Sequence, residues 1–90
     1  MKIPSILKIG GYDVKIDYDN STIQFGQFDP QKLSITLFSL NSSQNMSSTL
    51  IHEIIEALNY IYELDLPHDK ITVLANGMFQ VLKDNKLVFN

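Results

Sequence analysis

The sequence contains no cysteine and no arginine. Without cysteine the chain forms no disulfide bond and offers no thiolate to a metal ion. Without arginine it lacks the side chain that makes paired hydrogen bonds to phosphate or guanine. The net charge is −3, and the seven basic residues are scattered lysines, at Lys2, Lys8, Lys15, Lys32, Lys70, Lys83 and Lys86. These features argue against a nucleic-acid-binding surface, which requires clustered basic residues.

Long apolar segments are also missing. No run reaches the length of a membrane span, and residues 1–11 lack the apolar stretch of a signal peptide. We therefore expect a cytoplasmic protein without membrane contact, a location that the lack of cysteine also suits. The composition, 44% hydrophobic and 19% charged, is typical of a folded protein, and 90 residues predict a single domain, 1–90.

Apolar and polar residues alternate on both sides of Gly10-Gly11, from residue 6 to residue 18. Two glycines between alternating segments are typical of a tight β-hairpin turn. The alternation predicts a hairpin with one buried face and one face in water. The apolar residues expected on one face are Leu7, Ile9, Tyr12, Val14, Ile16 and Tyr18.

Two further segments, 22–28 and 33–38, alternate in the same way and are separated by a turn at Asp29-Pro30. Gly26 interrupts the first of them, which indicates a bulge or a close approach by another part of the chain. We expect these segments to complete an antiparallel sheet of three to four strands.

The second half of the sequence predicts two helices. Ser42 or Ser43 is a suitable N-cap for the first, and Asp65-Leu66-Pro67 should end it. Pro67 also suits the first turn of the second helix, in which we expect Gly77 to allow close helix packing. Residues 86–89 form an apolar tail, either a short strand or a frayed end. The predicted fold class is therefore α+β, an antiparallel sheet followed by two helices.

Residues 52–56 of the first helix read H-E-x-x-E. Helical residues four apart lie one turn apart on the same face, so His52 and Glu56 point the same way and Glu53 lies beside them. This is the arrangement of the zinc-peptidase helix H-E-x-x-H, with Glu56 in place of the second histidine. It predicts His52 and Glu56 as metal ligands and Glu53 as the group that handles the proton of a water molecule.

The same three residues have a purely structural interpretation. They belong to the polar stripe opposite the apolar face of the helix, and an ordinary amphipathic helix places that stripe in water. His52 and Glu56 would then be an exposed pair with no chemical role.

Two residues at the start of the second helix compete as third ligand. His68 lies on the apolar stripe with Ile71 and Ala75, so a short connection between the helices would bring it to the first helix. It would otherwise bond only to a neighbour at its own helix N-terminus. Asp69 is the competitor, although an acid in a first turn is also favoured by the helix dipole alone.

The segments Gly26-x-x-Asp29, Leu33-Ser34-Ile35 and 49–57 together resemble the small zincin-like metallopeptidases of phages and mobile elements, which are similar to the ImmA/IrrE and SprT-like groups. The resemblance covers residues 22–84, and 66–85 look like the second helix of such proteins. It implies a zincin-like fold with bound Zn²⁺, in which His52 is the first ligand and Glu53 the general base. Glu56 stands where the family usually has histidine, and a carboxylate there lowers the Lewis acidity of the metal.

Three functions follow from these interpretations. The first is a metal-dependent peptidase with His52, Glu56 and His68 as ligands and Tyr60 as a candidate oxyanion donor. The second is a non-catalytic, zincin-derived binding or regulatory protein, and the third a structural domain without metal. Peptides or proteins are the expected substrates or partners. The oligomeric state stays open, and exposed tyrosines are compatible with a dimer.

Overall fold

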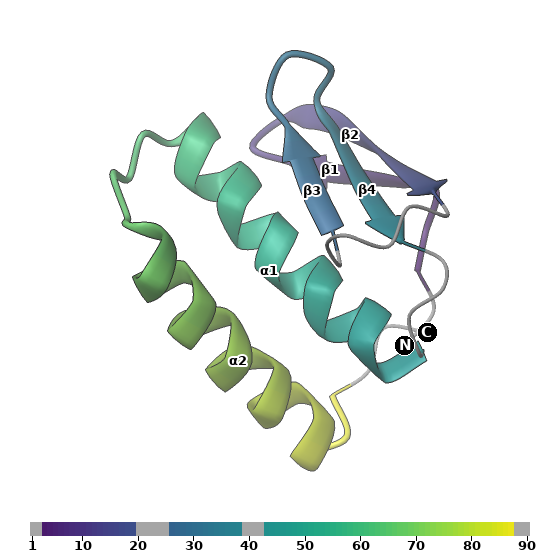
Figure 1. The fold of residues 1–90 in the computed structure, drawn as a ribbon, viewed down its shortest axis with the longest axis vertical. Helices are drawn as coiled ribbons and strands as arrows, with labels where there is room; N and C mark the ends of the chain where they lie inside the picture. The colour runs from purple at the N-terminus through teal and green to yellow at the C-terminus, as the bar shows by residue number, and fades with distance from the viewer. Residues whose placement is uncertain (1–2, 20–25, 39–42, 88–90) are drawn as a thin grey trace.

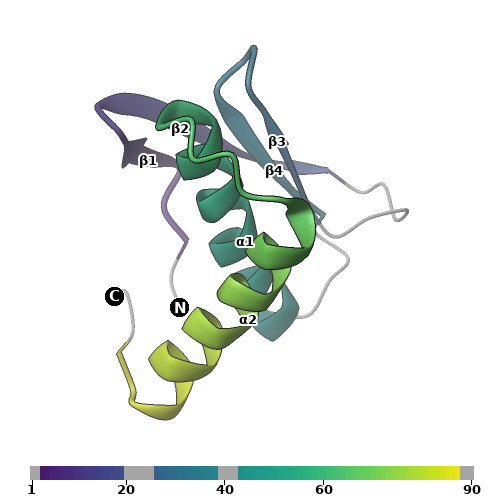
Figure 2. The same cartoon turned by 90° about the vertical axis from the view of Figure 1, so that its left-hand side faces the viewer.

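A computed structural model describes residues 3–19, 26–38 and 43–87. It contains a four-stranded sheet followed by two helices, which confirms the predicted α+β class. The elements are β1 (Ile6–Ile9), β2 (Tyr12–Asp19), β3 (Gly26–Asp29), β4 (Ser34–Phe38), α1 (Ser43–Ile61) and α2 (His68–Asp84). α1 lies between the sheet and α2, so the molecule has three layers (Figures 1 and 2).

The sheet has the order β1-β2-β4-β3. The predicted hairpin is confirmed, with Ile9 paired to Tyr12 across Gly10-Gly11, both of which have positive φ. The prediction that the sheet is antiparallel throughout is wrong, because β2 and β4 pair in parallel. β3 occupies the edge and β4 inserts between β2 and β3. Alternation determines which face of a strand is buried, but it does not determine the neighbouring strand.

Several predicted boundaries shift or fall outside the described residues. α1 begins at Ser43, one of the two predicted N-cap residues, and ends at Ile61, before the expected stop at Asp65-Leu66-Pro67. Residues 22–25 of the predicted third segment, Ser42 and residues 88 and 89 of the predicted tail lie outside the described ranges.

Apolar residues of the sheet and of α1 form the main core, and a second, smaller core lies between α1 and α2. The buried members of the first are Ile9, Val14, Ile16, Ile35, Leu37, Leu50 and Ala57, and those of the second are Ile51, Ile55, Ile71 and Ala75. Tyr12 and Tyr18 lie near the ends of β2 and are exposed, contrary to the predicted buried face. α1 therefore buries two apolar faces, which leaves its polar stripe between the sheet and α2.

Gly77 does not serve the packing of the two helices, so that prediction is wrong. A Cβ atom at Gly77 would meet no described atom within 4 Å, whereas Ile71 and Ala75 are the buried residues of α2. Gly77 thus faces away from α1. Neither described helix is both long and apolar enough to cross a bilayer.

Candidate metal site

The polar stripe of α1 is covered where it carries His52, Glu53 and Glu56. The side chains of His52 and Glu56 are 19% and 25% exposed, and Glu53 is 8% exposed. β3 lies on one side of this stripe and the start of α2 on the other (Figure 1). The expectation that this part of the stripe lies in water is therefore wrong, whereas the chemical role of His52 and Glu56 stays a prediction.

The start of α2 brings His68 to this stripe. His68 Nδ1 lies 3.0 Å from Glu56 Oε2, and His52 Nε2 lies 3.3 Å from the same oxygen. The two imidazole rings meet edge to face, with centroids 5.1 Å apart. His68 faces α1 as its place in the helical projection predicts, but its side chain is 74% exposed because it lies at the end of the packed region. Among the described residues, Asp69 is not part of this group.

His52, Glu56 and His68 form a group that could hold a metal ion. Each offers one ligand atom, and the three atoms lie within 4.8 Å of one another. Two ligands of a tetrahedral zinc ion with bonds of about 2.0–2.1 Å are roughly 3.3 Å apart. The two measured separations from Glu56 Oε2 are close to this value. The same separations are also those of hydrogen bonds from two imidazoles to one carboxylate oxygen.

Glu53 lies beside this group and against the edge strand β3. A Cβ atom at Gly26 would collide with Thr49 Cγ2 and would lie 3.4 Å from Glu53 Cγ, so the chain approaches α1 closely here, as the interruption at Gly26 predicts. Burial raises the pKa of Glu53 from 4.5 to about 7, and the negative charge of Glu56 adds to this. The charge of His68 and a hydrogen bond to the backbone of Phe28 oppose the rise in pKa. Glu53 is thus a carboxyl that exchanges a proton near neutral pH.

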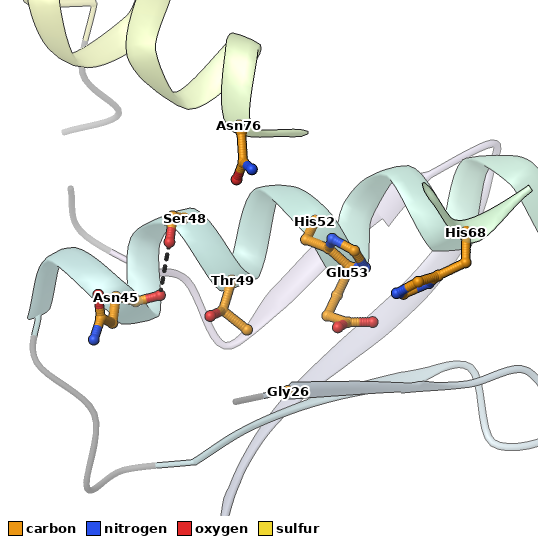
Figure 3. Close-up of a pocket in the computed structure, with 8 residues that line it drawn as sticks. All are labelled: Gly26, Asn45, Ser48, Thr49, His52, Glu53, His68 and Asn76. Carbon is orange, nitrogen blue, oxygen red and sulfur yellow. Dashed lines mark hydrogen bonds between the residues drawn. The ribbon is translucent and has the colours of Figure 1, made fainter. Parts of the chain in front are cut away.

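An open hollow of about 400 Å³ borders His52, Glu53 and His68 and extends along α1 towards its N-terminus. Figure 3 shows these three side chains at one end of the hollow and Asn45, Ser48 and Asn76 along the rest. Ser48 donates a hydrogen bond to the backbone oxygen of Asn45. Apart from Gly26, the residues that line the hollow all carry polar side chains, which suits a ligand with hydrogen-bonding groups such as a peptide backbone.

No family model, curated protein or solved structure matches this chain. The resemblance to zincin-like metallopeptidases therefore stays a prediction from the motif.

Tyr60 does not occupy the place expected of an oxyanion donor. Its ring packs against Phe28, with centroids 5.9 Å apart, and is exposed on its other side. It lines a separate hollow with Tyr12 and Leu33. Tyr60 thus packs on β3 and does not line the hollow beside His52.

The sequence analysis missed Asn59 as a positioning residue. Its amide oxygen accepts a hydrogen bond from Leu66 N at 2.9 Å, and its amide nitrogen donates to Leu66 O at 3.2 Å. These two bonds fix the connection between α1 and α2 two residues before His68. A sequence signal existed, because asparagine near a helix end readily bonds the backbone of a following turn. Asn76, which lines the hollow, had no comparable signal.

Proposed function

We propose that this protein is a zinc-dependent peptidase of the zincin type. The observation that carries the proposal is the convergence of three ligand atoms from two helices beside a buried carboxyl group. A carboxyl with a strongly perturbed pKa, here Glu53, that lies beside such a group and next to a hollow is a common feature of catalytic sites.

The donor set suits zinc. Two imidazole nitrogens and one carboxylate oxygen are a common ligand set of catalytic zinc, which leaves the fourth tetrahedral position for water or substrate. When bound, zinc would polarise the scissile carbonyl and acidify water. His52, Glu56 and His68 would hold the ion.

Glu53 would act as the general base. Without a metal ion the pKa of Glu53 is raised to about 7, and the positive charge of bound zinc would lower it, so that the carboxylate would be available as a base at neutral pH. Its carboxylate would take the proton of the attacking water and then deliver it to the leaving amine. The hollow along α1 would receive the peptide, with the Asn76 amide available to donate or accept and the Ser48 hydroxyl, which already donates to Asn45 O, available to accept. A cytoplasmic location and a phage or mobile-element origin stay predictions.

The first test measures zinc bound by the untagged protein after loading with zinc and dialysis. We expect about one zinc ion per chain, a loss of zinc in His52→Ala and His68→Ala, and retention in Asp69→Ala. Asp69→Ala is the matched control, because Asp69 neighbours His68 and lies outside the group of three. Circular dichroism of each variant shows whether it is folded. Equal zinc loss in Asp69→Ala would assign the third ligand differently.

The second test assays cleavage of unstructured peptides by zinc-loaded protein. Glu53→Gln should keep its zinc and lose at least about 100-fold in rate, as expected for removal of a general base. Zinc binding without cleavage by the wild type would favour a non-catalytic binding or regulatory protein. If folded wild-type protein takes up no zinc, the peptidase proposal fails.

A further inference from the structure

The outer face of α2 exposes a cluster of apolar side chains. α2 forms the outer layer of the molecule (Figure 2), and a shallow, mostly apolar hollow lies on its surface. Val73 is 70% exposed, and Leu74, Met78 and Val81 are between 44% and 48% exposed. Side chains of this kind on one helix face are typical of a surface that another helix covers.

Gly77 lies at the centre of this face. It is an interior residue of the helix, where alanine would give a more stable helix than glycine. Glycine costs about 1 kcal/mol relative to alanine at such a position. No described atom lies within 4 Å of where its Cβ would be, so packing within the described chain does not require glycine. The absence of a side chain does allow a second backbone to approach the helix closely at this point.

The residues around Gly77 form a pattern that matches a second, antiparallel copy of the same helix. Val73 and Val81 lie one turn before and one turn after Gly77, and Lys70 and Asp84 lie two turns before and after it. All five therefore share one helix face. In an antiparallel pair of α2 helices with a twofold axis at Gly77, Val73 meets Val81 of the partner subunit, and Lys70 meets Asp84 of the partner subunit.

The opposite charges at the two ends of this face, Lys70 and Asp84, also favour a second copy of the chain over another kind of partner. Within the described part of the chain, Lys70 has no ion-pair partner, and Asp84 accepts a hydrogen bond only from Gln80. A uniformly acidic or uniformly basic peptide would match one end and be repelled at the other. A reversed copy of α2 matches both ends.

We propose that the protein forms a homodimer through antiparallel contact of two α2 helices, centred on Gly77. The contact leaves Ile71 and Ala75 in the core with α1, so it requires no change in the fold. One helix pair buries less than the area of about 800 Å² per partner of a standard interface, so we expect dissociation in the range of about 10–500 µM.

The test is sedimentation equilibrium over this concentration range with charge-reversed variants. Wild-type protein should dimerise. Lys70→Glu and Asp84→Lys should each raise the dissociation constant at least about tenfold, because each places like charges together at both ends of the helix pair. An equimolar mixture of the two variants should form a heterodimer, since each then supplies the charge that the other needs.

Two controls make the result specific. Lys32→Glu changes the same charge in the exposed turn before β4 and should leave dimerisation unchanged. Gly77→Leu adds a bulky side chain where the helices meet and should abolish the dimer while leaving the helical circular dichroism intact. A wild-type protein that stays monomeric over the whole range overturns the proposal. A dimer that these substitutions and the mixture do not affect overturns it as well.

Discussion

Replacing Glu53 with glutamine should stabilise the metal-free protein at alkaline pH. The Glu53 carboxyl is buried beside Glu56, and its pKa rises from 4.5 to about 7. The folded chain therefore binds this proton more tightly than the unfolded chain does. This tighter proton binding adds to the free energy of unfolding. The added stability is fully present below about pH 4.5, and it is lost as the pH rises through about 7.

The size of the effect follows from the two pKa values. Each tenfold difference in proton affinity corresponds to about 1.4 kcal/mol, so a change from 4.5 to about 7 gives roughly 3 kcal/mol. Glutamine has nearly the same shape and carries no charge, and its amide oxygen can still accept the backbone hydrogen bond. Above about pH 8, we expect Glu53→Gln to exceed the wild type by about 1–3 kcal/mol in free energy of unfolding, and near pH 4.5 the difference should vanish.

The assay is urea unfolding in the presence of a chelator, at about pH 4.5 and about pH 8.5. Glu63→Gln is the matched control, because Glu63 is exposed, and it should change little at either pH. The reasoning is refuted if Glu53→Gln and the wild type differ by the same amount at both pH values. A glutamate whose ionisation destabilises the fold is typical of a group that takes part in catalysis.

Three further predictions concern Glu56 and two residues that support the site, Asn59 and Gly26. Glu56→His should raise the rate of peptide cleavage per bound zinc, because a neutral ligand leaves the metal more electrophilic, and an unchanged rate would contradict this. Asn59→Ala should weaken zinc binding by about tenfold in calorimetric titration, whereas Asn59→Asp, which still accepts from Leu66 N–H, should lose less. Gly26→Ala should lower the free energy of unfolding by about 1–3 kcal/mol, and adding Thr49→Ser, which removes Cγ2, should restore part of it.

Local signals in the sequence predicted the elements of the fold well. Gly10-Gly11 between alternating segments predicted the hairpin because the turn needs positive φ at both positions, and both residues have it. The helical spacing predicted α1 and α2, and the four-residue spacing of His52 and Glu56 placed them on one face. These features depend only on neighbours along the chain.

Features that depend on distant parts of the chain were not predictable in this way. The parallel pairing of β2 and β4 requires β3 to take the edge, and the alternation of β3 and β4 is compatible with either order. The burial of Glu53 depends on that same choice. With β3 at the edge, Gly26 lets this strand approach α1 closely and cover a stripe that projection alone places in water.

The third ligand shows why projection does not complete the site. Consecutive residues of a helix point about 100° apart, so His68 and Asp69 cannot both face α1, and the projection favours His68. Whether His68 reaches Glu56 depends on how far along α1 the second helix begins. That distance is set by the connection, which Asn59 holds through both backbone groups of Leu66. The contact of His68 with Glu56 is therefore a property of the turn between the helices as much as of the H-E-x-x-E motif.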